Sequence, residues 1–201
     1  MRCLTRACCH GGSSVPRPDA DATRSGGAGG GAVSLREPST ADELALLRWR
    51  GDAANEPLML WHGTARGPSD VKAWVARRTG DPAGRFWIVT DRTGEAVGFA
   101  QLTAINVRDG HAACGLFVDE SVRGRGVSAA ALTILVEASR ELGLRKLVIE
   151  VLATNARAID FWTRSGFARV GVLREHYACA GQRHDVVMME RLLAEPTETA
   201  T

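Results

Sequence analysis

The residues best suited to chemistry lie where an apolar stretch, 116–118, runs into a segment rich in glycine and arginine. Gly124 and Gly126 allow a close approach to the backbone, and Arg123 and Arg125 add positive charge. A helix that begins here has unpaired N–H groups and a partial positive charge at its first turn, which suits a phosphate group. We therefore predict an anion site. The alternative is a strand-to-helix turn in which the glycines serve only the bend.

A second candidate for chemistry is Glu150, a carboxylate within the apolar stretch 146–152. In a strand, Val148 and Leu152 would share its face. A carboxylate in such surroundings can take the proton that an ammonium group must lose before the amine can attack an electrophile. The alternative is a glutamate held by an ion pair at the end of a sheet.

A sheet and several helices must position these residues, and the apolar periodicity predicts both. We expect helices from 40 to about 50, over 69–78, from about 126 to 142 and over 155–165, and strands at 33–36, 85–90, 96–105, 111–118, 146–152, 167–176 and 184–192. Thr40 and Glu43 predict a capping box, Gly166 predicts a left-handed helix end, and 51–68 is expected to be a loop. This order predicts an α+β domain, a mixed sheet with helices on both faces.

Composition sets the broad class of the protein. The chain has 201 residues, 45% of them apolar, enough for one globular domain, which we place at 33–195. Residues 1–32 are rich in glycine and proline and predict a disordered tail, and 196–201 predict a frayed end. A net charge of +2 does not favour a nucleic-acid partner, and the lack of a long apolar run does not favour a membrane partner. We therefore expect a soluble, cytoplasmic protein. The five cysteines have no spacing typical of a metal site or a disulfide framework.

Two segments together resemble the GCN5-related N-acetyltransferase (GNAT) superfamily. The acetyl-CoA loop of that family, Arg/Gln-x-x-Gly-x-Gly/Ala, is matched by Arg123, Gly126 and, less closely, Ser128. The block 147–167 is similar to the family's strand, asparagine, Ala-Ile helix and closing Gly-Phe. Residues 171–188 resemble the branch that contains ribosomal-protein N-terminal acetylases and small-molecule amine acetylases. The resemblance extends over about residues 33–193.

The resemblance implies a mostly antiparallel sheet whose central strands, 116–118 and 146–152, splay apart around acetyl-CoA. It implies direct acetyl transfer to an amine, with no metal and no covalent enzyme intermediate. The implied cosubstrate-binding residues are Leu116, Phe117, Val118, Arg123, Gly124, Arg125, Gly126, Val127, Ser128, Asn155 and Trp162. Asn155 can also serve as a helix N-cap.

The catalytic roles follow from the same resemblance. Glu150 stands where the ribosomal acetylases have their general base. The family tyrosine that protonates the leaving thiolate is replaced by Trp162, and an indole cannot be that acid. Tyr177, the only tyrosine, is our candidate for the acid, with water or another residue as alternatives. Cys114 is expected to pack in the core.

The acceptor amine is predicted from two segments, 47–52 and the last hairpin. Residues 47–52 resemble a stretch of acetylases that act on amino sugars, so Arg48, Trp49 and Arg50 are expected to contact the acceptor, with Asp185 from the last hairpin. The alternatives are an inward-packed tryptophan and an aspartate that stabilises the hairpin. We predict an acetyltransferase for small primary amines such as amino sugars or aminoglycosides. A protein N-terminal acetyltransferase and a non-catalytic acetyl-CoA sensor are the alternatives, and a homodimer is possible.

Overall fold

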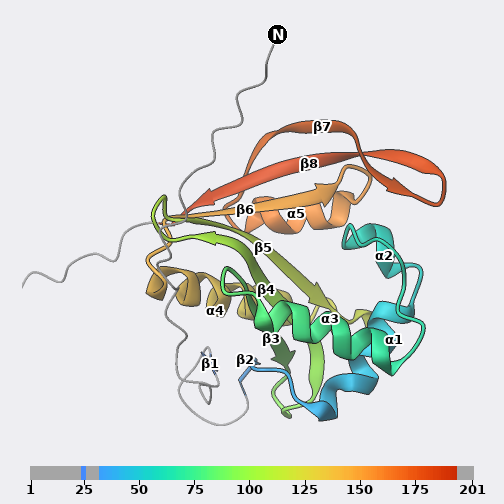
Figure 1. Ribbon diagram of the computed structural model, residues 1–201. Helices are drawn as coiled ribbons and strands as arrows, with labels where there is room; N and C mark the ends of the chain where they lie inside the picture. Colours follow the sequence, from blue (N-terminus) through green and yellow to red (C-terminus); the bar gives the residue numbers. More distant parts are fainter. Residues whose placement is uncertain (1–23, 26–31, 194–201) are drawn as a thin grey trace, which may run out of the picture.

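The computed structural model describes residues 24–25 and 32–193 (Figure 1). Its helices are η1 (Thr40–Asp42), α1 (Glu43–Gly51), α2 (Asn55–Leu58), α3 (Pro68–Gly80), η2 (Glu120–Val122), α4 (Val127–Glu141) and α5 (Ala156–Arg164). Its strands are β1 (Arg24–Ser25), β2 (Ser34–Arg36), β3 (Arg85–Thr90), β4 (Ala96–Asn106), β5 (His111–Val118), β6 (Lys146–Leu152), β7 (Ala168–Cys179) and β8 (Gln182–Leu192). In this part of the chain they form one sheet in the order β1-β2-β3-β4-β5-β6-β8-β7.

The predicted helices and strands of the domain are confirmed, with two local corrections. The segment predicted as a loop contains the short helix α2. Its helical turn is closed by the hydrogen bond from the Met59 N–H to the Asn55 carbonyl, 3.1 Å. The capping box lies one residue before the predicted pair. There the Asp42 carboxylate accepts the Ser39 N–H at 2.7 Å and also pairs with Arg36 at 2.6 Å. Asp42 is held by Arg36, which lies on β2 outside the helix start. The local sequence pattern does not contain this contact, and so it could not distinguish Asp42 from Glu43.

The two ends of the chain were predicted to lack structure. Residues 1–23 and 26–31 of the expected tail, and the expected frayed end at 196–201, lie outside the described residues. Arg24–Ser25 forms β1, which pairs antiparallel with β2, so these two residues belong to the sheet rather than to an unstructured tail.

Helices cover both faces of the sheet, as predicted. On one face, α4 and α5 pack on the sheet through a large apolar core that includes Leu135, Leu147 and Trp162. On the other face, α1 and α3 pack through an aromatic cluster that includes Trp74 and Phe99. Figure 1 shows α1, α2 and α3 grouped at one end of the molecule, beside the ends of β5 and β6.

The central strands β5 and β6 separate part-way along their length. They pair in parallel only from His111 and Lys146 to Ala113 and Val148. Beyond that point β5 stays bonded to β4 and β6 stays bonded to β8, so the two facing edges have no strand partner. The predicted splay of the central strands is confirmed.

Candidate active site

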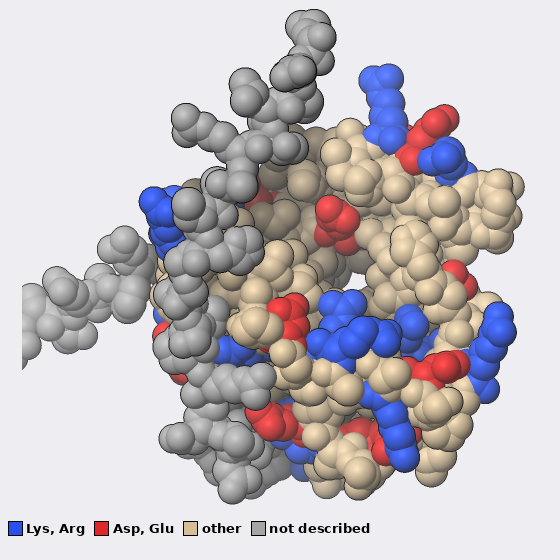
Figure 2. All heavy atoms as spheres, in the orientation of Figure 1, with Lys and Arg blue, Asp and Glu red and all other residues tan. Residues whose placement is uncertain are grey.

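A cleft of about 640 Å³ occupies the space between the splayed strands. Its walls include Leu116, Phe117 and Val118 of β5 and 148–151 of β6, and α5 closes one side. Figure 2 shows the molecule hollowed at this place, with basic side chains gathered along one border. The cleft therefore exposes the unpaired edges of two strands to an elongated ligand.

The glycine loop at the start of α4 forms one end of this cleft. Gly124 and Gly126 both have a φ of +80°, which side chains other than glycine rarely adopt. Among the described residues, the N–H groups of 126–129 have no hydrogen-bond acceptor, because the first helical bond is from Ala130 to Gly126. Arg123 donates its Nε to the Val118 carbonyl at 3.2 Å. The end of α4 thus offers free donors and charge to an anion.

The predicted cosubstrate residues do not all face the cleft. Arg123, Gly124, Gly126 and Ser128 line it, whereas Arg125 and Val127 do not. Val127 is instead buried in the apolar core beneath the loop. Val127 therefore supports the loop from the core side instead of lining the cleft.

Two residues from α5 and its N-terminus complete this wall. The Asn155 side chain accepts the Ala158 N–H at 3.1 Å and also lines the cleft, so the N-cap role holds while the residue remains at the surface of the cleft. Trp162 is only 5% exposed and packs edge-on against Phe167, with ring centroids 4.8 Å apart. Trp162 therefore forms a rigid part of the wall.

Glu150 projects into the cleft from β6. Ile149 and Val151 point into the core, whereas the Glu150 side chain is exposed and lines the cleft. Within the described residues no cation lies at ion-pair distance from its carboxylate. The structure thus does not support the ion-pair alternative for this glutamate.

Among the cleft residues that sequence reasoning missed, Gln101 of β4 is polar and buried at its oxygen. Gln101 lies opposite Gly115 of β5, and Ala113 lies opposite Val148 of β6. Because side chains alternate along a strand, Gln101 and Glu150 lie on the same face of the sheet. The Gln101 Oε1 is buried without a hydrogen-bond partner in the described structure. A Cβ at Gly115 would lie 2.9 Å from its Nε2, so the glycine makes room for this side chain. The available signal was a lone polar residue in an apolar strand.

The comparisons with known proteins agree with this geometry. The sequence model of the Acetyltransferase (GNAT) family matches residues 48–167. The chain belongs to the GNAT acetyltransferase family. A relative, the L-methionine sulfoximine/L-methionine sulfone acetyltransferase of Pseudomonas aeruginosa, is 26% identical over 173 residues, which are 84% of this chain and 98% of that protein.

Solved structures show the same fold. The spermidine N-acetyltransferase of Vibrio cholerae in complex with CoA and spermine has a TM-score of 0.74 and 20% identity, covering 80% of this chain and 95% of that one. A putative phosphinothricin N-acetyltransferase has a TM-score of 0.67 and 20% identity, covering 82% and 100%. The predicted GNAT fold is therefore confirmed. The family match identifies the protein as an acetyltransferase.

Tyr177 of this acetyltransferase does not reach the cleft. It is 3% exposed, and its hydroxyl donates to the carbonyl of Trp61 and, at 3.3 Å, to that of Glu56. Burial, with nearby Cys179 and Glu56, raises the pKa of its phenol. Tyr177 is absent from the residues that line the cleft. Its contacts are those of a residue that fastens α2 and the following loop onto β7.

We expect Tyr177→Phe to lower stability without removing turnover. The change leaves two buried carbonyls without their donor and should cost about 1 kcal/mol of unfolding free energy. Urea unfolding and kcat, measured on the same preparation, test this. A loss of kcat by two orders of magnitude with unchanged stability would instead restore Tyr177 as the acid.

Two of the three expected acceptor residues on α1 bind the loop after β5 instead. Trp49 is 2% exposed and donates its indole N–H to Asp119 at 2.5 Å, and Arg48 pairs with the same carboxylate at 2.9 Å. The inward-packed alternative for Trp49 is therefore what the structure shows. Burial opposes ionisation of Asp119, but the bonds from Ser121 and Trp49 and the charge of Arg48 outweigh it and lower its pKa to about 2.

Asp119 therefore makes a pH-dependent contribution to folding. Because the folded pKa lies below the ordinary value near 3.9, the contribution is complete above that value and is lost as the pH falls toward about 2. We expect Asp119→Asn to lower the unfolding free energy at pH 7 by about 1–3 kcal/mol. The deficit should shrink between about pH 4 and pH 2. Urea unfolding across this range tests the expectation, and a pH-independent deficit would contradict it.

The remaining predicted contacts also lie outside the cleft lining. Asp185 accepts the Glu175 N–H at 2.8 Å, where the pairing of β7 and β8 shifts register, so it stabilises the hairpin. The guanidinium of Arg50 lies 4.3 Å from the ring centre of Trp61. Neither residue lines the cleft itself.

The cysteines show no catalytic arrangement in the described residues. Cys114 is a buried free thiol, and burial raises its pKa to about 12, which agrees with core packing. In the described ranges no group of three or more His, Cys, Asp or Glu residues could hold a metal ion. Cys3, Cys8 and Cys9 lie outside those ranges. None of the helices that the structure describes is long and apolar enough to cross a membrane.

Proposed function

We propose that this protein transfers the acetyl group of acetyl-CoA directly to a primary amine of a small molecule, within the cleft between β5 and β6. The observation that carries the proposal is the cleft itself. An unpaired strand edge leads from a carboxylate to a glycine loop with free N–H groups. An elongated cosubstrate with a phosphate group at one end and a reactive thioester at the other fits this arrangement of donors and acid–base groups.

The roles of the residues follow from their places in the cleft. The free N–H groups of 126–129, with Arg123, would hold the phosphates. The free edge of β5 and Asn155 would hold the amide groups of the pantetheine arm, because such a backbone edge needs partners.

Glu150 would act as the general base. It accepts a proton from the acceptor ammonium, and the freed amine nitrogen forms a bond to the thioester carbonyl carbon while the carbon–sulfur bond breaks. The acetylated nitrogen gives up its second proton to water, and the departing CoA thiolate takes a proton from water, so the products are the neutral amide and the free thiol. A thiol has a pKa near 8.5, far below that of an alcohol, and so the thiolate is the better leaving group. It can leave without a general acid of the kind that an alkoxide would need.

The names of the relatives support a small acceptor. They act, by name, on L-methionine sulfoximine or sulfone and on spermidine, and one is a putative phosphinothricin acetyltransferase. All of these acceptors are small amines rather than proteins. An amino sugar stays our prediction from the sequence. A homodimer also stays a prediction, with the exposed Val170 and Val172 of edge strand β7 as a surface for it.

Release of free thiol from acetyl-CoA, measured against a panel of small amines and peptides with free N-termini, tests the proposal. We expect release with at least one small amine and recovery of the N-acetylated product by mass spectrometry. Turnover with peptides alone would indicate a protein N-terminal acetyltransferase. Binding of acetyl-CoA without turnover of any amine would indicate a sensor.

A further inference from the structure

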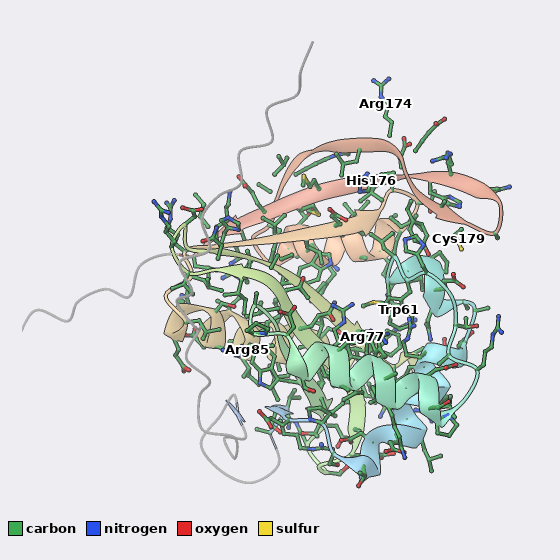
Figure 3. The ribbon with its side chains drawn as sticks, viewed as in Figure 1. Trp61, Arg77, Arg85, Arg174, His176 and Cys179 are labelled. Atoms are coloured by element: carbon green, nitrogen blue, oxygen red, sulfur yellow. The ribbon has the colours of Figure 1, made fainter. Side chains whose placement is uncertain are left out.

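Three arginines from two helices gather beside the cleft: Arg50 at the end of α1 and Arg77 and Arg78 near the end of α3. Arg78 and Arg77 both lower the pKa of Arg50 through charge repulsion, after the larger effect of burial. The Arg50 guanidinium lies 4.3 Å from the ring centre of Trp61 and 5.3 Å from that of Trp74. Figure 3 labels Trp61 and Arg77, which appear in the same part of the view, beside α3.

This arginine cluster (Arg50, Arg77 and Arg78) lacks a counter-anion in the described structure. None of the three guanidinium groups has a carboxylate within ion-pair distance. Glu56 attracts Arg50 and Asp81 attracts Arg78 from beyond ion-pair distance, and the Glu56 carboxylate already accepts the Gly63 N–H at 2.8 Å. Burial, and then repulsion among the arginines, lowers the pKa of Arg50 and Arg78. The cluster is therefore under electrostatic strain that a bound anion would relieve.

One donor of the cluster is also left without an acceptor. The Arg50 Nε is buried and has no hydrogen-bond partner in the described structure, and its Nη2 has only a long bond of 3.3 Å to the Gly63 carbonyl. The face of the guanidinium is already occupied by two indole rings, so its orientation is fixed. A planar fork held in this way suits an oxyanion that can accept two parallel N–H groups.

The contacts of the cluster place it on the sheet face that carries Glu150, where the acceptor would approach. The C-terminal end of α3 leads through 81–84 into β3, where Arg85 pairs with Leu102. The neighbouring residues Gln101 and Thr103 line the cleft, as does Leu60, which precedes Trp61. The glycine loop follows β5 after Val118, and α1 contacts its first residue Asp119 through Arg48 and Trp49. None of the three arginines lines the cleft beside that loop. The two indole rings under Arg50 pack on Phe99, on the sheet face that carries Gln101 and Glu150.

We infer that the acceptor amine carries an oxyanion, which the arginine cluster binds while the amine reaches Glu150. This inference rests on the proposed function and narrows its acceptor. A phosphate monoester, with a charge near −2, balances three guanidinium groups better than a singly charged carboxylate does. Both anions present a pair of oxygens that can accept two N–H groups of one guanidinium. Polycations such as polyamines and aminoglycosides would be repelled. Gln101, with its buried free Oε1, would accept an N–H or O–H of the same acceptor.

Matched pairs of amines test the inference: glucosamine against glucosamine 6-phosphate, ethanolamine against phosphoethanolamine, and an amino acid against its amide. We expect kcat/KM to be at least about tenfold higher for the anionic member of a pair, because hydrogen bonds to an ionised group are stronger than those between neutral groups. The phosphate pairs and the carboxylate pair identify which oxyanion is preferred. Spermidine should be a poor substrate.

Variants connect the preference to the cluster. The double change Arg77→Ala and Arg78→Ala should bring the ratio within each pair close to one. Arg92→Ala, an exposed arginine in the β3–β4 turn, should leave the ratio unchanged. Circular dichroism and the melting temperature verify that each variant folds. A wild-type preference for neutral or polycationic amines, or an unchanged ratio in the folded double variant, would overturn the inference. If no amine releases thiol, the proposed function itself fails.

Discussion

Replacing Glu150 with Gln should lower kcat for amine acetylation by about two to three orders of magnitude while acetyl-CoA still binds. The amide keeps the size and the exposed position of the side chain on β6, but it cannot take a proton from the acceptor ammonium. The defect should narrow as the pH rises toward the pKa of the amine, because free amine then forms without a base. The measurement is kcat as a function of pH for both proteins.

A matched control for this change lies on the neighbouring strand. Glu190→Gln removes a carboxylate of β8 that pairs with Lys146 at 3.4 Å and lies outside the cleft lining. We expect Glu190→Gln to retain the wild-type pH profile. Wild-type kcat at every pH in Glu150→Gln would remove this residue from the chemistry.

The second large effect is expected from Gly124→Val in the loop before α4. Valine at a φ of +80° is strained by about 1–3 kcal/mol, and the loop can escape that strain only by moving its backbone. Movement would displace the N–H groups and Arg123 that we assign to the phosphates. The dissociation constant of acetyl-CoA should therefore rise about tenfold or more. Isothermal titration calorimetry measures it directly.

Gly94→Val separates loop strain from binding. Gly94 has a φ of +85° and open space around its Cβ position, as Gly124 does, but it lies in the β3–β4 turn. Both substitutions should lower the melting temperature by a similar amount. Only Gly124→Val should lower the affinity for acetyl-CoA. Equal affinity in the two variants would show that the glycine loop does not hold the cosubstrate.

Most elements of this fold could be predicted because their signals are local. The helix over 127–141 and the strands around the cleft carry clear apolar periodicity, and Gly166 ends α5 with a φ of +84° as expected. The short helix α2 could not be predicted in the same way. It has four residues, too few for any periodicity, and it depends on contacts such as that of the Asn55 side chain with the Trp49 carbonyl.

The parts of the candidate site that lie within a single short segment of the chain could be predicted from the sequence. The loop at 123–128 and Glu150 both lie at the cleft. The acceptor side depends on residues brought together from distant segments, and there local reasoning failed. Trp49 resembled a ligand contact, but its partner Asp119 is 70 positions away in the chain. Arg77 and Arg78 fit the usual preference for basic residues at a helix end, so nothing in the local sequence pointed to Arg50 as their neighbour.

Binding of acetyl-CoA between β5 and β6 underlies all the proposals above, and amide hydrogen exchange with and without acetyl-CoA tests it most directly. We predict slower exchange on binding for the N–H groups of 126–129 and along the free edge of β5, with little change in β2 and β3. Protection confined to other parts of the chain, with these amides unchanged at saturating acetyl-CoA, would contradict the account.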